Sequence, residues 1–165
     1  MAKFYSTKTY GNDRGLSCCF RQWRATHSHC SLLHGYSIGI KLIFESETLD
    51  DKNWVMDFGG LKEFKTWAEH MFDHTLIIAE DDPHLEMFKQ MSLLGLQDQG
   101  GVCDLRIVPA VGCEKFAELA FNKMNEILNK MKEFPDSTRY PVNPDLKLKS
   151  VEVFEHEANS AVYEG

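Results

Sequence analysis

The stretch His34-Gly35-Tyr36-Ser37-Ile38-Gly39-Ile40-Lys41-Leu42-Ile43-Phe44-Glu45 predicts a long β-strand. Its even-numbered positions from 36 to 44 are all apolar, and most residues between them are polar or glycine. Side chains alternate between the two faces of a strand, so one face of this strand is expected to cover a hydrophobic core. An extended segment, 17–27, precedes it, and the short link 30–33 predicts that the two segments form a hairpin.

Two amphipathic helices are expected further along the chain. One spans about 60–72 and the other 113–134, and in each the apolar residues recur at helical spacing. Asp82-Pro83 predicts the start of a shorter helix. Further strands are expected at 75–78, 105–108 and 146–156. No linker or repeat divides the chain, so a single domain over 1–165 is expected, of the α+β class, with a mainly antiparallel sheet and helices packed on one face.

Composition narrows the class of protein. The 165 residues are 43% hydrophobic and contain no apolar run long enough to span a membrane. The 18 lysines and arginines against 25 acidic residues give a net charge of −7, which disfavours nucleic-acid binding. The N-terminus lacks the apolar stretch of a secretory signal, and the five cysteines form no CxxC pair. We therefore expect a soluble cytoplasmic protein with free thiols.

Three of the seven histidines lie within eight residues, at His27, His29 and His34. Residues two apart in an extended chain face the same side, so His27 and His29 can point together, and the predicted bend can bring His34 opposite them. Three neutral imidazoles around an open fourth position are what a catalytic zinc requires. From spacing alone, a metal site and a group of ordinary histidines near a turn remain equally open.

Two further candidates come from short patterns. In Asp73-His74, directly after the first helix, a carboxylate is placed to fix the tautomer of an imidazole and raise its basicity. In the last strand, Glu155 follows Val151 and Val153 on one face, where a carboxylate can accept two N–H donors of a guanidine-like ring edge. An ordinary helix C-terminal turn and a solvent-facing glutamate are the alternative interpretations of these two patterns.

Five groups of residues occur in order along the chain. They are Trp23-x-Ala25-x-His27 with Cys30-x3-His34-Gly35-Tyr36, then Val55-Met56-Asp57-Phe58-x2-Leu61-Lys62, Phe72-Asp73-His74, Glu114-x2-Ala117, and Val151-x-Val153-x-Glu155 through Tyr163. This series resembles the signature F-x-A-x-H … C-x3-H-G-H, V-M-D-F-x-x-L-K, (L/F)-D-H, T-x-E-N-x-A and V-x-V-x-E-T … Y of the 6-pyruvoyltetrahydropterin synthase / 6-carboxytetrahydropterin synthase family. Each match is short, but together they span nearly the whole chain.

The resemblance implies a T-fold (tunnelling fold), in which an antiparallel sheet carries helices on one face and trimerises into a barrel. It also implies a homo-oligomer, usually a hexamer formed as a dimer of trimers, with active sites between subunits. The implied substrate is 7,8-dihydroneopterin triphosphate, and the implied cofactor is a zinc ion bound by three histidines.

Residue roles follow from the matched positions. Cys30 is expected to be the catalytic thiol, with Asp73 and His74 as its partners from a neighbouring subunit. Glu155 is expected to anchor the pterin, and Glu114 to assist it. The resemblance therefore assigns a catalytic group and a substrate-binding group.

The chain departs from the family pattern at several of these positions. Tyr36 stands where the second histidine of H-G-H is expected, and a phenol is a poorer zinc ligand than an imidazole. We therefore predict the ligand set His27, His29 and His34, with Tyr36 as the substitute. Gly112 replaces the threonine of T-x-E, which leaves the pterin contacts open to difference.

The resulting expectation is a zinc-dependent lyase. It would convert 7,8-dihydroneopterin triphosphate to 6-carboxy-5,6,7,8-tetrahydropterin with loss of triphosphate and acetaldehyde, as in queuosine biosynthesis. Two alternatives stay open, the 6-pyruvoyl product without side-chain cleavage and a non-catalytic pterin-binding relative. Arg21, Arg24 and Lys62 are candidates to meet the triphosphate, with solvated surface as the other interpretation.

Overall fold

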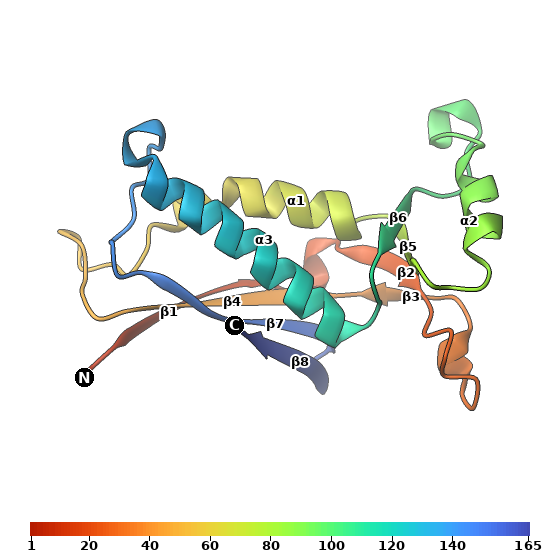
Figure 1. The fold of residues 1–165 in the computed structure, drawn as a ribbon, viewed down its shortest axis with the longest axis horizontal. Helices are drawn as coiled ribbons and strands as arrows, with labels where there is room; N and C mark the ends of the chain where they lie inside the picture. The colour runs from red at the N-terminus through yellow and green to blue at the C-terminus, as the bar shows by residue number, and fades with distance from the viewer.

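The computed structural model describes residues 1–165, which form two four-stranded sheets (Figure 1). The predicted long strand is present, but it is divided at Ile38 into β3 (His34–Ser37) and β4 (Gly39–Ser46). The two pieces belong to different sheets, whose strand orders are β1-β4-β7-β8 and β3-β2-β5-β6. The stretch around Ile38 therefore joins the two halves of the molecule.

The first sheet is antiparallel throughout and carries the long helices. It contains β1 (Phe4–Tyr10), β4, β7 (Lys147–His156) and β8 (Asn159–Glu164). Helices α1 (Lys62–Phe72) and α3 (Cys113–Glu133) lie on one face of it (Figure 1). The expected α+β fold with helices on one face is therefore confirmed.

The hydrophobic core lies between this sheet and these helices. The apolar face of β4 is fully buried at Ile40, Leu42 and Phe44, as the alternation predicts. The apolar stripe of α3 packs on β7 and β8 of the same sheet, and its members are buried. These are Phe116, Ala120, Met124, Ile127 and Met131.

The second sheet is mixed, and here the expectation of little parallel pairing is wrong. β2 (Ser17–Phe20) and β3 form the predicted antiparallel hairpin. β5 (Thr75–Ala79), however, pairs in parallel with both β2 and β6 (Leu105–Val108). The 25-residue connection between β5 and β6 carries α2 (Leu85–Ser92) and is long enough for a parallel crossover.

Two edge strands, β1 and β8, have no counterpart among the predicted elements. About half of their residues are polar, because an edge strand exposes much of its surface and needs no continuous apolar face. α2 also begins at Leu85 rather than at Asp82-Pro83, since the Asp82 carboxylate binds Arg21 and the backbone N–H of His84.

Short 3₁₀ turns complete the chain. They are η1 (Asn12–Arg14), η2 (His29–Ser31), η3 (Phe58–Leu61), η4 (Gln97–Gln99) and η5 (Pro135–Ser137). Among all the helices, none combines the length and the apolar character that crossing a membrane requires.

Candidate active site

A cavity of about 470 Å³ lies where β2, β3, the start of α3 and the turn between β7 and β8 meet. Its lining includes Cys30, Glu114 and Glu155, three of the residues that the sequence singles out. Tyr36 lines it as well. Segments that lie far apart in the sequence thus bring a thiol, two carboxylates and a phenol to one cavity.

The turn η2 that carries Cys30 is held from three sides. The Ser28 hydroxyl accepts a hydrogen bond from the Cys30 N–H at 3.0 Å. The backbone N–H of Gln22 donates to the Cys30 carbonyl at 2.8 Å. The Arg21 guanidinium donates to the Ser31 carbonyl at 3.1 Å. These bonds fix the backbone on both sides of the thiol.

Arg21 is itself held by a bidentate ion pair with Asp82. Its Nε and Nη2 lie 2.8 and 2.7 Å from the two carboxylate oxygens, and the Asp82 side chain is only 1% exposed. Burial alone would raise the pKa of this carboxyl, but the hydrogen bonds from Arg21 and from the His84 N–H hold the pKa below its usual value. The ion pair therefore stays charged at neutral pH and ties η2 to the start of α2.

The two glutamates that line the cavity come from different elements. Glu155 lies near the end of β7, after the buried Val151 and Val153, and is half-buried next to an irregularity in the pairing with β8. Glu114 lies in the first turn of α3. The lining also includes the rings of Phe20 and Tyr36, an aromatic surface that suits a flat heterocycle.

Gly112 explains one departure from the family pattern. Its φ of 113° lies in a region that L side chains rarely adopt, and a Cβ there would come within 2.5 Å of Gln22 Nε2. That amide donates to the Val111 carbonyl at 2.7 Å. Glycine is therefore required where the signature has threonine.

Tyr36 lies at the back of the cavity between two rings. It stacks on Phe20 with ring centroids 4.0 Å apart, and the His34 ring is 4.5 Å away. Burial, reinforced by Glu155, raises the pKa of Tyr36 to about 12. The phenol is therefore neutral near pH 7 and acts as a hydrogen-bond donor rather than as an anionic ligand.

A second thiol, Cys113, also lines the cavity. Burial raises its pKa to about 11, with Glu155 and Glu114 adding to the effect. Cys113 is therefore protonated near neutral pH, which makes it a poor base.

Asp73 and His74 lie away from the cavity. His74 Nδ1 is 2.5 Å from the Asp73 carboxylate, and the imidazole is 86% exposed. His74 adopts a left-handed φ of 57° and its N–H donates to the Ser17 carbonyl, at the start of β2. The Cys30 carbonyl is hydrogen-bonded to the N–H of Gln22. Gln22 follows Ser17 by five residues, which is roughly 16 Å along an extended chain. One subunit thus does not bring Asp73-His74 to its own Cys30.

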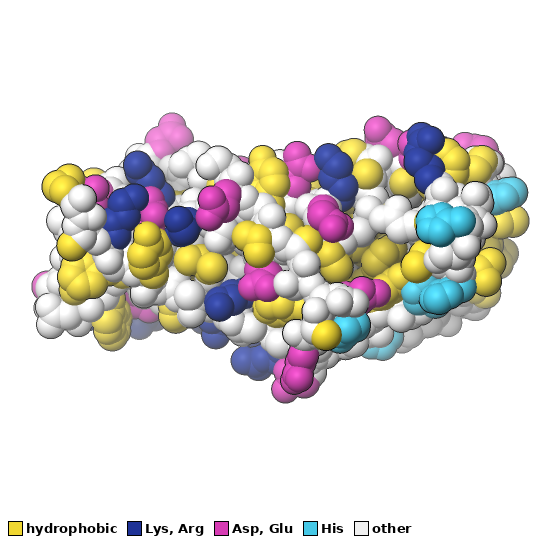
Figure 2. All heavy atoms as spheres, turned by 90° about the horizontal axis from the view of Figure 1, so that it is seen from below, with side chains coloured by type: hydrophobic (Ala, Val, Ile, Leu, Met, Phe, Trp, Pro, Cys, Tyr) yellow, Lys and Arg dark blue, Asp and Glu magenta, His cyan; other side chains and the backbone are white.

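The three predicted metal ligands do not converge within one chain. No group of three or more histidine, cysteine or acidic side chains is close enough to hold a metal ion. The rings of His29 and His34 are nearest, with centroids 6.4 Å apart, and His27 does not complete a group with them. Histidine side chains do gather toward the end of the molecule that carries β2, β3 and η2 (Figure 2). Imidazole nitrogens are ligands that zinc prefers, but within one chain the three histidines do not lie close enough together to bind one ion.

Several lining residues had no signal as functional residues in the sequence. Gln22 is the second residue after β2, and Asn159 and Ser160 begin the edge strand β8. The apolar residues of 159–164 form one run, Ala161 to Tyr163, and do not alternate with polar ones, so the sequence pattern does not indicate this strand.

Comparison with known proteins places the chain in a family. The family model of 6-pyruvoyl tetrahydropterin synthase matches residues 12–165. The 6-carboxy-5,6,7,8-tetrahydropterin synthases of Rickettsia conorii and Rickettsia bellii are 33% and 32% identical to the chain over 57 residues, which is 34% of this chain and 41% of theirs. The aligned region thus spans about two fifths of these curated relatives.

Solved structures share the fold. An uncharacterized protein, WS1659 from Wolinella succinogenes, has a TM-score of 0.75 at 17% identity and covers 100% of this chain and 99% of its own. The 6-pyruvoyltetrahydropterin synthase of Plasmodium vivax has a TM-score of 0.61 at 15% identity, with the same coverage. That of Caenorhabditis elegans has a TM-score of 0.57 at 17% identity, covering 99% of this chain and 95% of its own. The architecture is therefore the T-fold of these structures.

Proposed function

Because the chain belongs to the 6-pyruvoyl tetrahydropterin synthase family, we propose that it is a lyase acting on 7,8-dihydroneopterin triphosphate. The observation that carries the proposal is the cavity that gathers Cys30, Glu114 and Glu155. We propose 6-carboxy-5,6,7,8-tetrahydropterin as the product, with triphosphate and acetaldehyde released. The partial match to the Rickettsia synthases favours this product over the 6-pyruvoyl one. Queuosine biosynthesis and a cytoplasmic location belong to the same proposal.

The carboxylates would hold the pterin. Glu155 would accept N–H donors from the guanidine-like edge of the ring, and Glu114, which lines the same cavity, would support it. Tyr36 stays neutral because its pKa is about 12, so it would donate a hydrogen bond to the ring or its side chain. This arrangement would place the side chain of the substrate toward Cys30.

Cys30 would act as a thiolate that removes a proton from a side-chain carbon. The C–O bond to the triphosphate then breaks, and triphosphate leaves with the bonding electrons. Asp73 accepts the Nδ1–H of His74, which leaves Nε2 as the proton acceptor. Because this pair lies away from the Cys30 of its own chain, we propose that a neighbouring subunit of a homo-oligomer, a hexamer built as a dimer of trimers, supplies it.

Zinc is part of the proposal because imidazole nitrogens are ligands that it prefers. When bound in such a site, it supplies Lewis-acid polarisation of substrate hydroxyls. His34 Nδ1 donates to the Leu32 carbonyl at 2.9 Å, which leaves Nε2 free to coordinate, and His29 is the nearest second imidazole. His27 would have to approach them to complete the set, so no step of the reaction is assigned to the metal.

Metal analysis tests the ligand set. We expect purified protein to carry close to one zinc per chain and His34→Ala to lose most of it, with His84→Ala as the matched control. A wild-type content well below one zinc per chain would mean that this ligand set is wrong.

A non-catalytic pterin-binding protein is the second candidate, and the missing three-ligand cluster favours it. It predicts pterin binding that survives chelators and Cys30→Ala, without turnover. Incubation with 7,8-dihydroneopterin triphosphate, with and without zinc, separates the candidates. The lyase releases acetaldehyde and 6-carboxytetrahydropterin, the 6-pyruvoyl alternative gives no acetaldehyde, and the binding protein gives neither product.

A further inference from the structure

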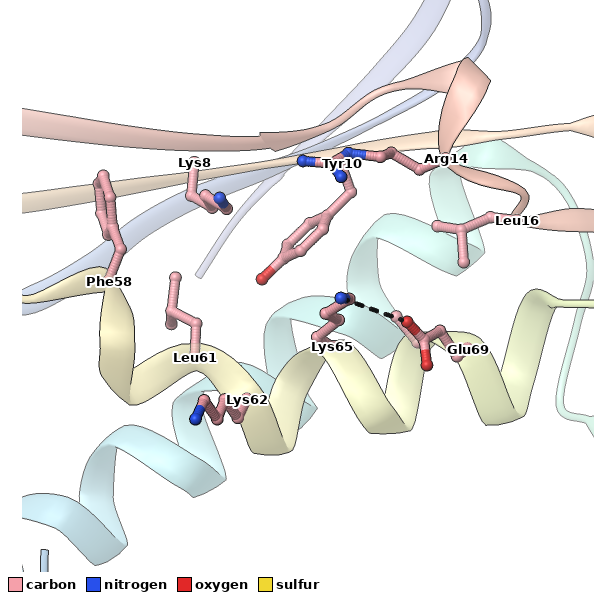
Figure 3. Close-up of a pocket in the computed structure, with 10 residues that line it drawn as sticks. Lys8, Tyr10, Arg14, Leu16, Phe58, Leu61, Lys62, Lys65 and Glu69 are labelled. Atoms are coloured by element: carbon pink, nitrogen blue, oxygen red, sulfur yellow. Dashed lines mark ion pairs between the residues drawn. The ribbon is translucent and has the colours of Figure 1, made fainter. Parts of the chain in front are cut away.

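A second cavity, of about 230 Å³, lies between β1 and α1 (Figure 3). It shares no lining residue with the cavity of Cys30. Lys8 lines it from β1, Arg14 from η1, and Lys62 and Lys65 from the first half of α1. Glu69 is the one acidic residue in the lining, and its carboxylate lies 3.8 Å from Lys65 Nζ. Four cationic side chains thus surround one compact space.

This concentration is unusual for an acidic protein with a net charge of −7. Eleven of the 18 lysine and arginine side chains make ion pairs with carboxylates. Three of the other seven, Lys8, Arg14 and Lys62, line this cavity. The global charge repels anions, so an anion can be held only where such unpaired cations gather.

Tyr10 adds a neutral hydrogen-bond donor to the same cavity. The residue is only 6% exposed, but its hydroxyl is open to solvent, has no hydrogen-bond partner in the protein and points into the space between β1 and α1 (Figure 3). Lys8 lies over the same ring, with Nζ 5.6 Å from the centroid. Burial raises the pKa of Tyr10 to about 12, so the phenol remains a neutral donor at physiological pH. The Tyr10 hydroxyl is thus a free hydrogen-bond donor in a cavity lined by cationic side chains, which suits an anionic acceptor.

We propose that this cavity binds a linear polyphosphate anion. Lys8, Arg14 and Lys65 would contact the phosphoryl oxygens, and Tyr10 would donate to one of them. The volume is below the ~300–1,000 Å³ of pockets that enclose a drug-sized ligand, so it suits a compact anion rather than the whole of 7,8-dihydroneopterin triphosphate. The choice of polyphosphate rests on the proposed function, whose substrate carries a triphosphate. The source is then either the tail of that substrate or free polyphosphate.

Isothermal titration with inorganic triphosphate, in buffer without divalent ions, tests the proposal on the full chain. We expect binding to the wild type that weakens as salt is raised. Lys8→Ala/Arg14→Ala should weaken it by about tenfold or more, and Tyr10→Phe by about fivefold. The control Lys41→Ala/Lys147→Ala removes two other unpaired cations and should bind as the wild type does. Circular dichroism verifies that each variant is folded.

Two results would overturn the proposal, the absence of triphosphate binding at millimolar concentration and equal binding by the cavity and control variants. Steady-state kinetics identify the source. If Lys8→Ala/Arg14→Ala raises KM with kcat unchanged and inorganic triphosphate competes with substrate, the substrate tail occupies the cavity. If KM is unchanged, the site serves free polyphosphate. Because the titration needs no turnover, it decides the proposal even if the protein proves not to be a lyase.

Discussion

Two thiols, those of Cys30 and Cys113, line the same cavity, but their surroundings differ. Burial and two glutamates raise the pKa of Cys113 to about 11. Cys30 lies instead on a turn whose backbone is held by three hydrogen bonds. We expect Cys30→Ala to lower the rate of product formation by at least about 10²-fold, because it removes the proposed base. Cys113→Ala should retain most of the activity. Assaying acetaldehyde release by both folded variants checks this, and an equal loss in both would contradict the assignment to Cys30.

The sequence indicated three of the cavity residues for identifiable reasons. Cys30, Glu114 and Glu155 each lie in a short motif, and the structure places all three in the lining. Their chemical roles stay predictions. Gln22 and Asn159 line the same cavity without any motif, because only the folding of β2 next to the β7–β8 turn brings them there. Proximity between distant segments is information that spacing along the chain does not contain.

Burial of a thiol also predicts how stability depends on pH. Cys18 is 4% exposed, and burial raises its pKa from 9.0 to about 12. The unfolded chain loses this proton above about pH 9, whereas the folded chain keeps it until about pH 12. The stabilising effect is therefore complete below pH 9 and is lost as the pH rises, at up to about 1.4 kcal/mol per pH unit for one such group.

Urea unfolding at a series of pH values from 8 to 10.5 measures this dependence. Cys18→Ala should be less stable at pH 8, because it leaves a small cavity, and should lose less stability on going to higher pH than the wild type does. Parallel curves for the two proteins would show that Cys18 does not keep its proton in the folded state.

At the level of elements, the ion pair between Arg21 and Asp82 joins η2 to the start of α2. Asp82 is 1% exposed at its side chain and Arg21 16%, so removing one charge leaves the other largely buried. We expect Asp82→Asn to reduce the free energy of unfolding by about 3 kcal/mol.

The neighbouring pair between Arg24 and Asp81 provides a matched control. Their side chains are 72% and 51% exposed, so Asp81→Asn should cost less than about 1 kcal/mol. Urea unfolding of both variants makes the comparison. A similar cost for the two substitutions would mean that the buried pair does not anchor η2.

The elements themselves were predictable to the extent that each has a periodic apolar face. α3 and β4 have such a face against the core and were expected within a few residues of their bounds. β1 and β8 lie at the edges of the first sheet, and their residues, about half of them polar, carry no such period. The continuous apolar run of β5, buried at all five residues, is typical of a parallel strand, and its parallel pairing was therefore open to prediction from the sequence.

On the scale of the whole molecule, the proposed catalytic groups are divided between two ends of β2. The N–H of His74 is hydrogen-bonded to Ser17, and the carbonyl of Cys30 is hydrogen-bonded to Gln22. β1 and β8 are both free edges of the first sheet, available to pair with other copies of the chain. If the proposed mechanism holds, a complete site needs Cys30 from one subunit and Asp73-His74 from the next.

Mixing two inactive variants tests this division. Cys30→Ala and His74→Ala should each be inactive as homo-oligomers. After dissociation and reassembly in equal amounts, random mixing gives about a quarter of the sites a cysteine from one chain and a histidine from the other, so about a quarter of wild-type activity should return. Mass spectrometry of differently tagged chains verifies that mixed oligomers form. Mixed oligomers without recovered activity would mean that Cys30 and His74 do not act across one subunit boundary, and activity in the unmixed His74→Ala protein would remove His74 from the mechanism.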